Sequence, residues 1–173
     1  MVDGLVGSEM CIRDSFPRDD SKKIKILSKY ANQYAAAGDK TLIDQLRGGN
    51  NYRTGNWQGY REDLNVIVDI SKVKKINSIS LGCHQDVRSW IFYPKQVNYW
   101  SSIDGKNYTY QGKVLANFPD NIEGSMQKDF ELNVTNLNAR YIKIKAENYG
   151  VCPDWHLGAG GKTWIFVDEI TIK

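Results

Sequence analysis

The sequence has no long hydrophobic run and little net charge. Among its 173 residues, no stretch approaches the roughly 18 apolar residues of a membrane-spanning helix, so we expect no membrane span. Lys and Arg number 23 against 20 Asp and Glu, a net charge of +3. This excess is too small and too dispersed to indicate nucleic-acid binding. Hydrophobic residues make up 41% and charged residues 25%, which excludes an intrinsically disordered chain.

The sequence also lacks the common catalytic motifs. It contains no G-x-S-x-G, H-E-x-x-H or phosphate-cradling loop. Glycoside hydrolysis needs two carboxylates that face each other across a cleft about 5 to 10 Å wide. The adjacent Asp168 and Glu169 instead point to opposite faces of an expected strand. We therefore expect no catalytic activity in this chain.

Cysteine and histidine are scarce, with three and two residues. Cys83 and His84 are adjacent at the end of an expected strand, where successive side chains point to opposite faces. This pair, together with Cys152 and His156, therefore does not indicate a zinc site. The sequence leaves open whether Cys83 and Cys152 form a disulfide.

Residues 1–15, MVDGLVGSEMCIRDS, differ from the rest of the chain. They have no hydrophobic period, and charge interrupts their apolar stretches too often for a signal peptide. The segment resembles translated sequencing-adaptor read-through. We expect a non-native or disordered leader here, containing Cys11, followed by a single domain over residues 16–173.

Apolar and polar residues alternate at period two along seven segments, which predicts β-strands. Asp104-Gly105 predicts a hairpin turn, residues 117–124 a longer polar loop, and residues 29–39 a helical turn. The fold class is therefore all-β, an antiparallel β-sandwich or jelly roll of about eight strands. The alternating residues are Ile24 and Ile26; Val66, Val68 and Ile70; Ile79 and Leu81; Val97 and Tyr99; Phe130, Leu132 and Val134; Ile142, Ile144 and Ala146; and Ile170 and Ile172.

Aromatic residues are the unusual part of the composition, at 12% with five Trp. Three Gly- and Trp-rich loops, residues 48–60, 82–94 and 148–164, are longer than a hairpin needs. In a sandwich, binding sites concentrate on such loops. We assign Trp100, in the strand QVNYWSS, to the core, and leave Trp57, Trp90 and Trp164 open between packing and binding. Trp155 is favoured for ligand contact because Pro153 and nearby glycines disfavour a packed strand.

These loops carry a resemblance to a known family. Over residues 35–173, the strings AGDKTLID, NWQGY, QDVRSWIFYP and ARYIKIKAENYGVCPDWHLGAGGKTWIFVDEI resemble the coagulation-factor type C, or discoidin, superfamily. More narrowly, SWIF.P and WH.GAGG..W.F.DEI are similar to family 32 carbohydrate-binding modules, in the version found at the C-terminus of bacterial exo-β-N-acetylhexosaminidases. One departure is Asp44-Gln45, where the family usually has Asp-Gly.

The resemblance implies a galactose-binding-domain-like sandwich that binds terminal galactose, N-acetylgalactosamine or N-acetylglucosamine. It also implies a glycoside hydrolase domain in the same parent chain, tethered to glycans by this module, and an extracellular, periplasmic or cell-surface location. A sugar site needs an aromatic platform and a few convergent polar groups. The candidate ligand-binding residues are Gln85, Asp86, Arg88, Trp90, Phe92, Trp155 and His156.

The same superfamily commonly joins its N- and C-terminal segments through one structural calcium ion. Asp44, Asn51 and Glu169 are the candidate metal ligands, because hard oxygen donors suit calcium. In the alternative interpretation, Asp44 caps a turn and Glu169 is a surface charge.

Two other functions compete with an appended sugar-binding module. One is a self-standing lectin or adhesion domain. The other is a discoidin domain that binds protein or lipid, for which Trp90-Ile91-Phe92 is the candidate membrane spike. Burial of this triplet would disfavour lipid insertion. Nucleic-acid binding through Lys143 and Lys145 near Tyr141 is disfavoured, because these lysines fit a solvated strand face.

Overall fold

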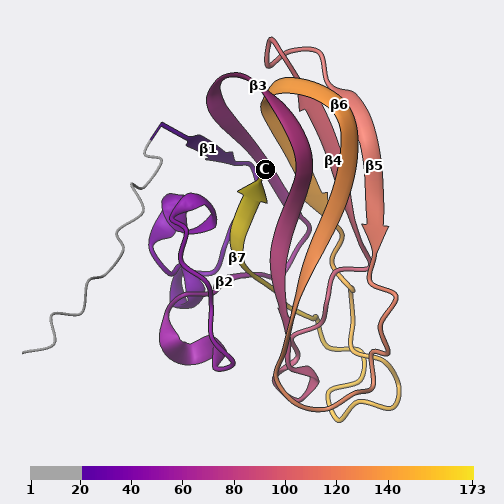
Figure 1. Cartoon of the computed structure of the whole chain (residues 1–173). Coiled ribbons are helices and arrows are strands. Elements are labelled where there is room, and N and C mark those ends of the chain that lie inside the picture. The colour runs from indigo at the N-terminus through magenta and orange to yellow at the C-terminus, as the bar shows by residue number, and fades with distance from the viewer. Residues whose placement is uncertain (1–20) are drawn as a thin grey trace, which may run out of the picture.

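Seven strands, all paired antiparallel, build the fold in residues 21–173, the part of the chain that the computed structural model describes (Figure 1). The all-β class is confirmed, whereas the expected leader over residues 1–15, with Cys11, lies outside the described residues. The strands are β1 (Lys23–Ile26), β2 (Gln58–Tyr60), β3 (Leu64–Gln85), β4 (Gln96–Ser102), β5 (Thr109–Leu115), β6 (Met126–Ala146) and β7 (Ile165–Ile172). The short 3-10 helices are η1 (Asn32–Tyr34), η2 (Gly38–Ile43), η3 (Tyr52–Thr54) and η4 (Val87–Ser89).

The order of the sheet is β2-β7-β3-β6-β4-β5, and β1 pairs with β3. β3 and β6 are 22 and 21 residues long and belong to both layers of the sandwich. The first half of β3 pairs with β1 and with the last part of β6, which in turn pairs with β4. The second half of β3 pairs with β7 and with the first part of β6. Figure 1 shows the two long strands curving together over the length of the molecule.

The seven predicted segments correspond to five of the observed strands, because two pairs of segments are continuous, and β2 and β5 were not predicted. Segments 66–70 and 79–81 both belong to β3, and segments 130–134 and 142–146 both belong to β6. The two strands shift register between Asp69 and Lys74 and again between Ile76 and Ser78. Such bulges bend a strand without ending it, so period-two alternation stops in sequence while the strand continues.

The main core lies between the two layers and contains the alternating apolar residues. Val66, Val68, Ile142 and Ile144 are fully buried, and each stabilises the fold by about 1.5 to 3 kcal/mol through removal of apolar surface from water. Their neighbours Lys143 and Lys145 are partly exposed, as expected of a strand with one solvated face. Trp100 is an exception to the predicted core: it lies outside all three buried clusters and contacts Tyr110 on the outer face, at 5.4 Å between ring centroids.

The loops follow the predicted pattern. Asp104 Oδ1 accepts the N–H groups of Lys106 and Asn107, both at 2.8 Å, in the turn between β4 and β5. Residues 117–124 form no strand, and the helical turn expected in residues 29–39 is η1 with the start of η2. No helix within residues 21–173 is long and apolar enough to cross a membrane.

Candidate functional site

The loop after β3 turns the side chain of Trp90 outward. Asp86 and Ile91 exchange two backbone hydrogen bonds, of 3.0 and 3.1 Å, and η4 lies between them. Trp90 closes η4 in the left-handed region, at φ 64° and ψ 20°, and its N–H donates to the carbonyl of Val87 at 3.0 Å. This backbone conformation is unusual for a bulky residue and marks a candidate functional position. It separates the exposed Trp90 from its buried neighbours Ile91 and Phe92.

Two glycines of the 148–164 loop lie directly against the indole of Trp90. A Cβ atom at Gly158 would come within 2.4 Å of the ring, and one at Gly161 within 2.5 Å. Both approaches are far shorter than van der Waals contact, so only glycine fits at either position while the ring keeps its place. The GAGG run is therefore a packing surface for Trp90.

His156 joins the two loops through its imidazole ring. Its Nδ1 accepts the N–H of Gly158 at 2.9 Å, which leaves Nε2 as the protonated nitrogen that donates to the carbonyl of Val87 at 2.6 Å. The ring is buried and lies edge-on to Trp90. His156 thus holds the loop geometry, while the adjacent Trp155 keeps 49% of its surface exposed.

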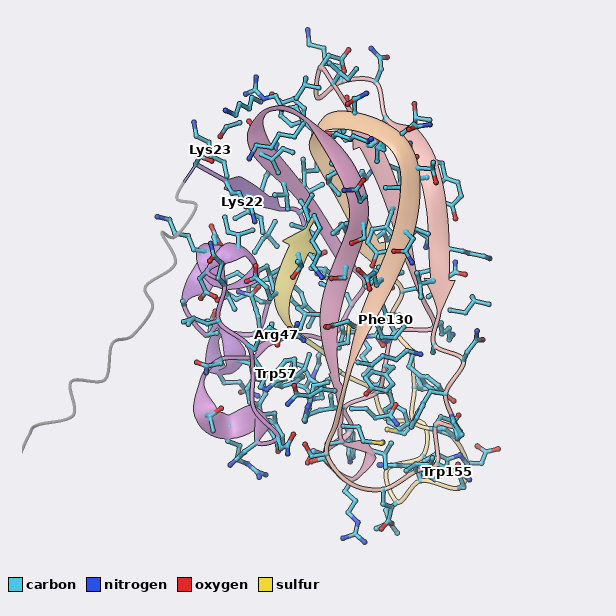
Figure 2. All side chains as sticks on the ribbon, viewed as in Figure 1. Lys22, Lys23, Arg47, Trp57, Phe130 and Trp155 are labelled. Atoms are coloured by element: carbon cyan, nitrogen blue, oxygen red, sulfur yellow. The ribbon has the colours of Figure 1, made fainter. Side chains whose placement is uncertain are left out.

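These side chains border a cavity of about 510 Å³ at the loop end of the sandwich. Figure 2 shows Trp155 among the loops at that end, far from Lys22 and Lys23. Arg88 and Glu123 form an ion pair on the border of the cavity. An exposed aromatic ring can stack on the apolar face of a sugar-like ring. The paired polar groups beside it can hydrogen-bond the hydroxyls of that ligand. The lining residues are Val87, Arg88, Trp90, Glu123, Trp155, His156 and Leu157.

Four of the seven predicted ligand residues line this cavity: Arg88, Trp90, Trp155 and His156. The other three do not. Phe92 is 0% exposed and stacks on Tyr149 at 4.8 Å, because the turn at Trp90 directs it inward. Gln85 is buried, and its Oε1 accepts the N–H of Tyr93 at 3.2 Å. Asp86 is partly buried, and its carboxylate accepts the hydroxyl of Ser89 at 3.0 Å.

Three of the lining residues were not predicted from the sequence. Glu123 belongs to the polar loop 117–124, whose position relative to η4 depends on strand pairing. Val87 and Leu157 are adjacent to predicted residues, and Leu157 is fully exposed. Adjacency to Trp155-His156 was the only signal that could have indicated Leu157.

Of the three tryptophans that the sequence left between packing and binding, two are packed in the interior and one lines the cavity. Trp57 and Trp164 are buried with Tyr52, Ile91 and Phe166 in a cluster separate from the main core. Trp57 also donates its indole N–H to the carbonyl of Gly49 at 2.9 Å. Of the five tryptophans, all within the described residues, Trp90 and Trp155 line the cavity.

Residues 45–48, which precede the loop of Trp57, are held to β7 by the buried carboxylates of Asp168 and Glu169. Asp168 is fully buried, and its Oδ2 accepts Nε of Arg47 and the N–H of Gly48, both at 2.8 Å. Arg47 also pairs with Asp129 at 2.6 Å. In Figure 2, Arg47 and Trp57 lie between the short 3-10 helices and the sheet. The cation compensates for only part of the cost of burying the Asp168 carboxylate, because burial still raises the pKa of Asp168 above its ordinary value.

The candidate metal ligands are partly brought together. Glu169 is only 5% exposed, and its Oε2 accepts the N–H of Gln45 at 2.9 Å. Burial, and to a smaller extent the charge of nearby Asp44, raises the pKa of Glu169 to about 8. Glu169 is therefore not the surface charge of the alternative interpretation, although Asp44 does cap a turn through the N–H of Leu46 at 2.8 Å. Asn51 is exposed and caps η3 by accepting the N–H of Arg53 at 3.0 Å.

Cys83 and His84 point to opposite faces of β3. Cys83 belongs to the main core, whereas His84 packs against Trp57 at 4.9 Å between centroids. Cys83 and Cys152 are free thiols, so the disulfide left open by the sequence is absent between them. Within residues 21–173, no group of three or more His, Cys, Asp or Glu side chains gathers in a metal-binding arrangement.

Known proteins share this architecture. A family model described as the F5/8 type C domain matches residues 23–168. The module CpGH89CBM32-5 from Clostridium perfringens, solved in complex with GalNAc-β-1,3-galactose, is 14% identical with a TM-score of 0.54, and the match covers 90% of this chain and 96% of that one. CBM32-3 from a family 31 glycoside hydrolase of the same organism is 12% identical with a TM-score of 0.54, covering 90% and 92%.

The C-terminal domain of a chitobiase from Bacteroides fragilis is 20% identical with a TM-score of 0.49, covering 90% of this chain and 95% of that one. A search of curated proteins finds no match. The likenesses to the two Clostridium modules show a shared fold.

Proposed function

The chain belongs to the F5/8 type C domain family, and on that premise we propose that it is a non-catalytic module that binds the terminal sugar of a glycan. The observation that carries the proposal is the cavity in which Trp155, half exposed, lies near the Arg88–Glu123 pair. Trp90 and Trp155 would supply the apolar platform. Arg88 and Glu123 would donate to and accept from the sugar hydroxyls.

The sugars to test first are galactose and N-acetylgalactosamine, followed by N-acetylglucosamine. A similar fold with this kind of ligand, GalNAc-β-1,3-galactose, supports that order. A cavity of about 510 Å³ at the protein surface holds only the end of a glycan, so few ligand atoms would be buried. We expect a dissociation constant on the order of 0.1 to 1 mM.

A glycan array tests the proposal directly, with Trp155→Ala as the decisive variant. We expect binding to glycans that end in one of the three sugars, and loss of detectable binding in the variant because the aromatic platform is gone. Tyr110→Ala is the matched control, because Tyr110 is also 49% exposed but lies on β5. Silence of the wild-type protein across all three sugar classes would refute the proposal, as would equal loss of binding in both variants.

A membrane-inserting function receives no support from the predicted spike. Ile91 and Phe92 are buried, so Trp90-Ile91-Phe92 does not form an exposed apolar triplet. A self-standing lectin or adhesion domain would use the same cavity as an appended module.

We also propose that the module is part of an extracellular or periplasmic glycoside hydrolase, specifically a β-N-acetylhexosaminidase, which it tethers to glycans. The strings SWIF.P and WH.GAGG..W.F.DEI support this parent. Recovery of the upstream reading frame tests it: a hexosaminidase domain is expected, and a reading frame that encodes only this domain would favour the self-standing lectin.

We further propose a structural calcium ion between Asp44 and Glu169 of β7. Asp44 and Glu169 provide two neighbouring carboxylates, one of them buried, which is a donor set that a divalent cation stabilises. When bound, the ion would displace the proton that the raised pKa of about 8 leaves on Glu169 and would neutralise both carboxylates. Asn51, exposed and already capping η3, would contribute less.

A further inference from the structure

A second groove, distinct from the cavity lined by Trp90 and Trp155, is bordered by positively charged side chains. Lys29, Arg61 and Lys162 border a hollow of about 470 Å³ together with the ring of Trp164. The backbone of Trp164 is hydrogen-bonded to Trp90, at 2.8 Å from N–H to carbonyl. A backbone hydrogen bond therefore joins the two residues, but their rings line different hollows.

Arg61 is held in place by stacking. Its guanidinium carbon lies 4.3 Å from the centroid of the Trp164 ring, a geometry that fixes a flexible cation by cation–π attraction. Trp164 is itself immobilised, because it is only 8% exposed and packs edge-on against Tyr34 at 5.3 Å. The groove thus contains one preorganised guanidinium rather than only mobile lysine side chains.

Within the described part of the chain, the three cations have no ion-pair partner of their own. Ion pairs in residues 21–173 join carboxylates to Arg47, Arg88, Arg140 and Lys145, and none involves Lys29, Arg61 or Lys162. Among the described residues that line the groove, the one carboxylate is Glu62, whose Oε1 accepts the backbone N–H of Lys29 at 3.1 Å. Three cations against one carboxylate leave an excess positive charge that an anionic ligand would neutralise.

We propose that this groove is a second binding site, specific for the carboxylate or sulfate groups of an acidic polysaccharide. The forked donors of Arg61 match either oxyanion. The side-chain amides of Asn32 and Gln33 border the same hollow and would hydrogen-bond sugar hydroxyls. A nucleic acid fits less well, because Arg61 covers the face of Trp164 on which a base would otherwise stack.

Affinity electrophoresis at low salt tests the site with three probes: polygalacturonate for carboxylates, dextran sulfate for sulfates, and neutral dextran. We expect retardation by one or both acidic polymers and none by dextran, and the retarding polymer identifies the preferred group. Arg61→Gln with Lys162→Gln should weaken that binding by about 5- to 20-fold, given what exposed charge pairs contribute. Retardation should also decrease as salt screens the charges.

Two control variants show whether acidic-polymer binding depends on this groove. Lys113→Gln removes a charge on β5, outside the groove, and should change binding little. Trp155→Ala should leave acidic-polymer binding intact even though it removes neutral-sugar binding, so failure of either proposal is visible independently of the other. The melting temperature of each variant is measured alongside, so that a loss of binding is not mistaken for a loss of folding.

Three results would overturn the proposal. The first is no retardation of the wild-type protein by either acidic polymer. The second is an equal effect of Lys113→Gln and of the double variant. The third is equally tight, equally variant-sensitive binding of a single-stranded oligonucleotide, which would indicate unselective polyanion binding.

Discussion

Replacement of Gly158 by alanine perturbs the candidate sugar cavity from behind, because it displaces Trp90, one of the two rings of the proposed platform. The added Cβ would lie 2.4 Å from the ring of Trp90, whereas ordinary contact begins near 3.4 Å. The indole must therefore move by about 1 Å, because the backbone at Gly158 is not strained and the ring is the nearest obstacle. Overpacking of this kind costs about 1 to 3 kcal/mol of folding free energy.

We expect Gly158→Ala to remain folded but to lose roughly 10-fold or more in sugar affinity, since a wall of the site displaced by about 1 Å no longer matches the ligand. Calorimetric titration with the best array sugar measures the affinity, and near-ultraviolet circular dichroism reports the indole environment. Gly49→Ala is the control, because nothing lies within 4 Å of its added Cβ. Unchanged affinity and melting temperature in Gly158→Ala would refute the stacking of Trp90 on the glycine run.

Three further predictions concern stability. Calcium should raise the melting temperature and a chelator should lower it, while Glu169→Gln should abolish both shifts; a wild-type melting temperature indifferent to calcium would remove the proposed ion. Arg47→Met should destabilise the protein by about 2 kcal/mol in urea unfolding, because the buried Asp168 carboxylate loses its cation. The Arg140 guanidinium holds the pKa of Asp69 below its ordinary value through two hydrogen bonds of 2.9 Å. The pair therefore stabilises the fold above that ordinary pKa and loses its effect as pH falls through the lowered one. Asp69→Asn should cost up to about 1 kcal/mol at pH 7, and this cost should shrink progressively as the pH is lowered below the ordinary pKa of the carboxyl.

The fold class, and the loops that border the candidate site, could be predicted from the sequence. Period-two alternation marked every strand core except β2 and β5, because a strand with one buried face must alternate wherever it is placed. The three long loops were located to within a few residues, since residues 58–60 form β2 and residues 82–85 end β3, and two of these loops supply Trp90 and Trp155. Continuity of β3 and β6 was missed, since bulges interrupt the alternation without ending the strand.

Side-chain direction within the loops could not be predicted. Trp90 and Phe92 are two residues apart in the same motif, yet one lines the cavity and the other is fully buried. The left-handed conformation of Trp90 separates the two directions, and its indole packs against Gly158 and Gly161, in a loop nearly 70 residues away. Trp100 was assigned to the core because it lies in a predicted strand, but the face it occupies is the solvated one.

By itself, the sequence determined an all-β domain, the loops that border the candidate site, and the aromatic residues available to them, because backbone periodicity and turn chemistry are local properties. Only the tertiary structure decided which of those side chains meet. Strand order brings Arg88 to Glu123, and it brings Lys29, Arg61 and Lys162 together around Trp164. Contacts between residues this distant in sequence arise from strand pairing and layer packing, which no local pattern specifies.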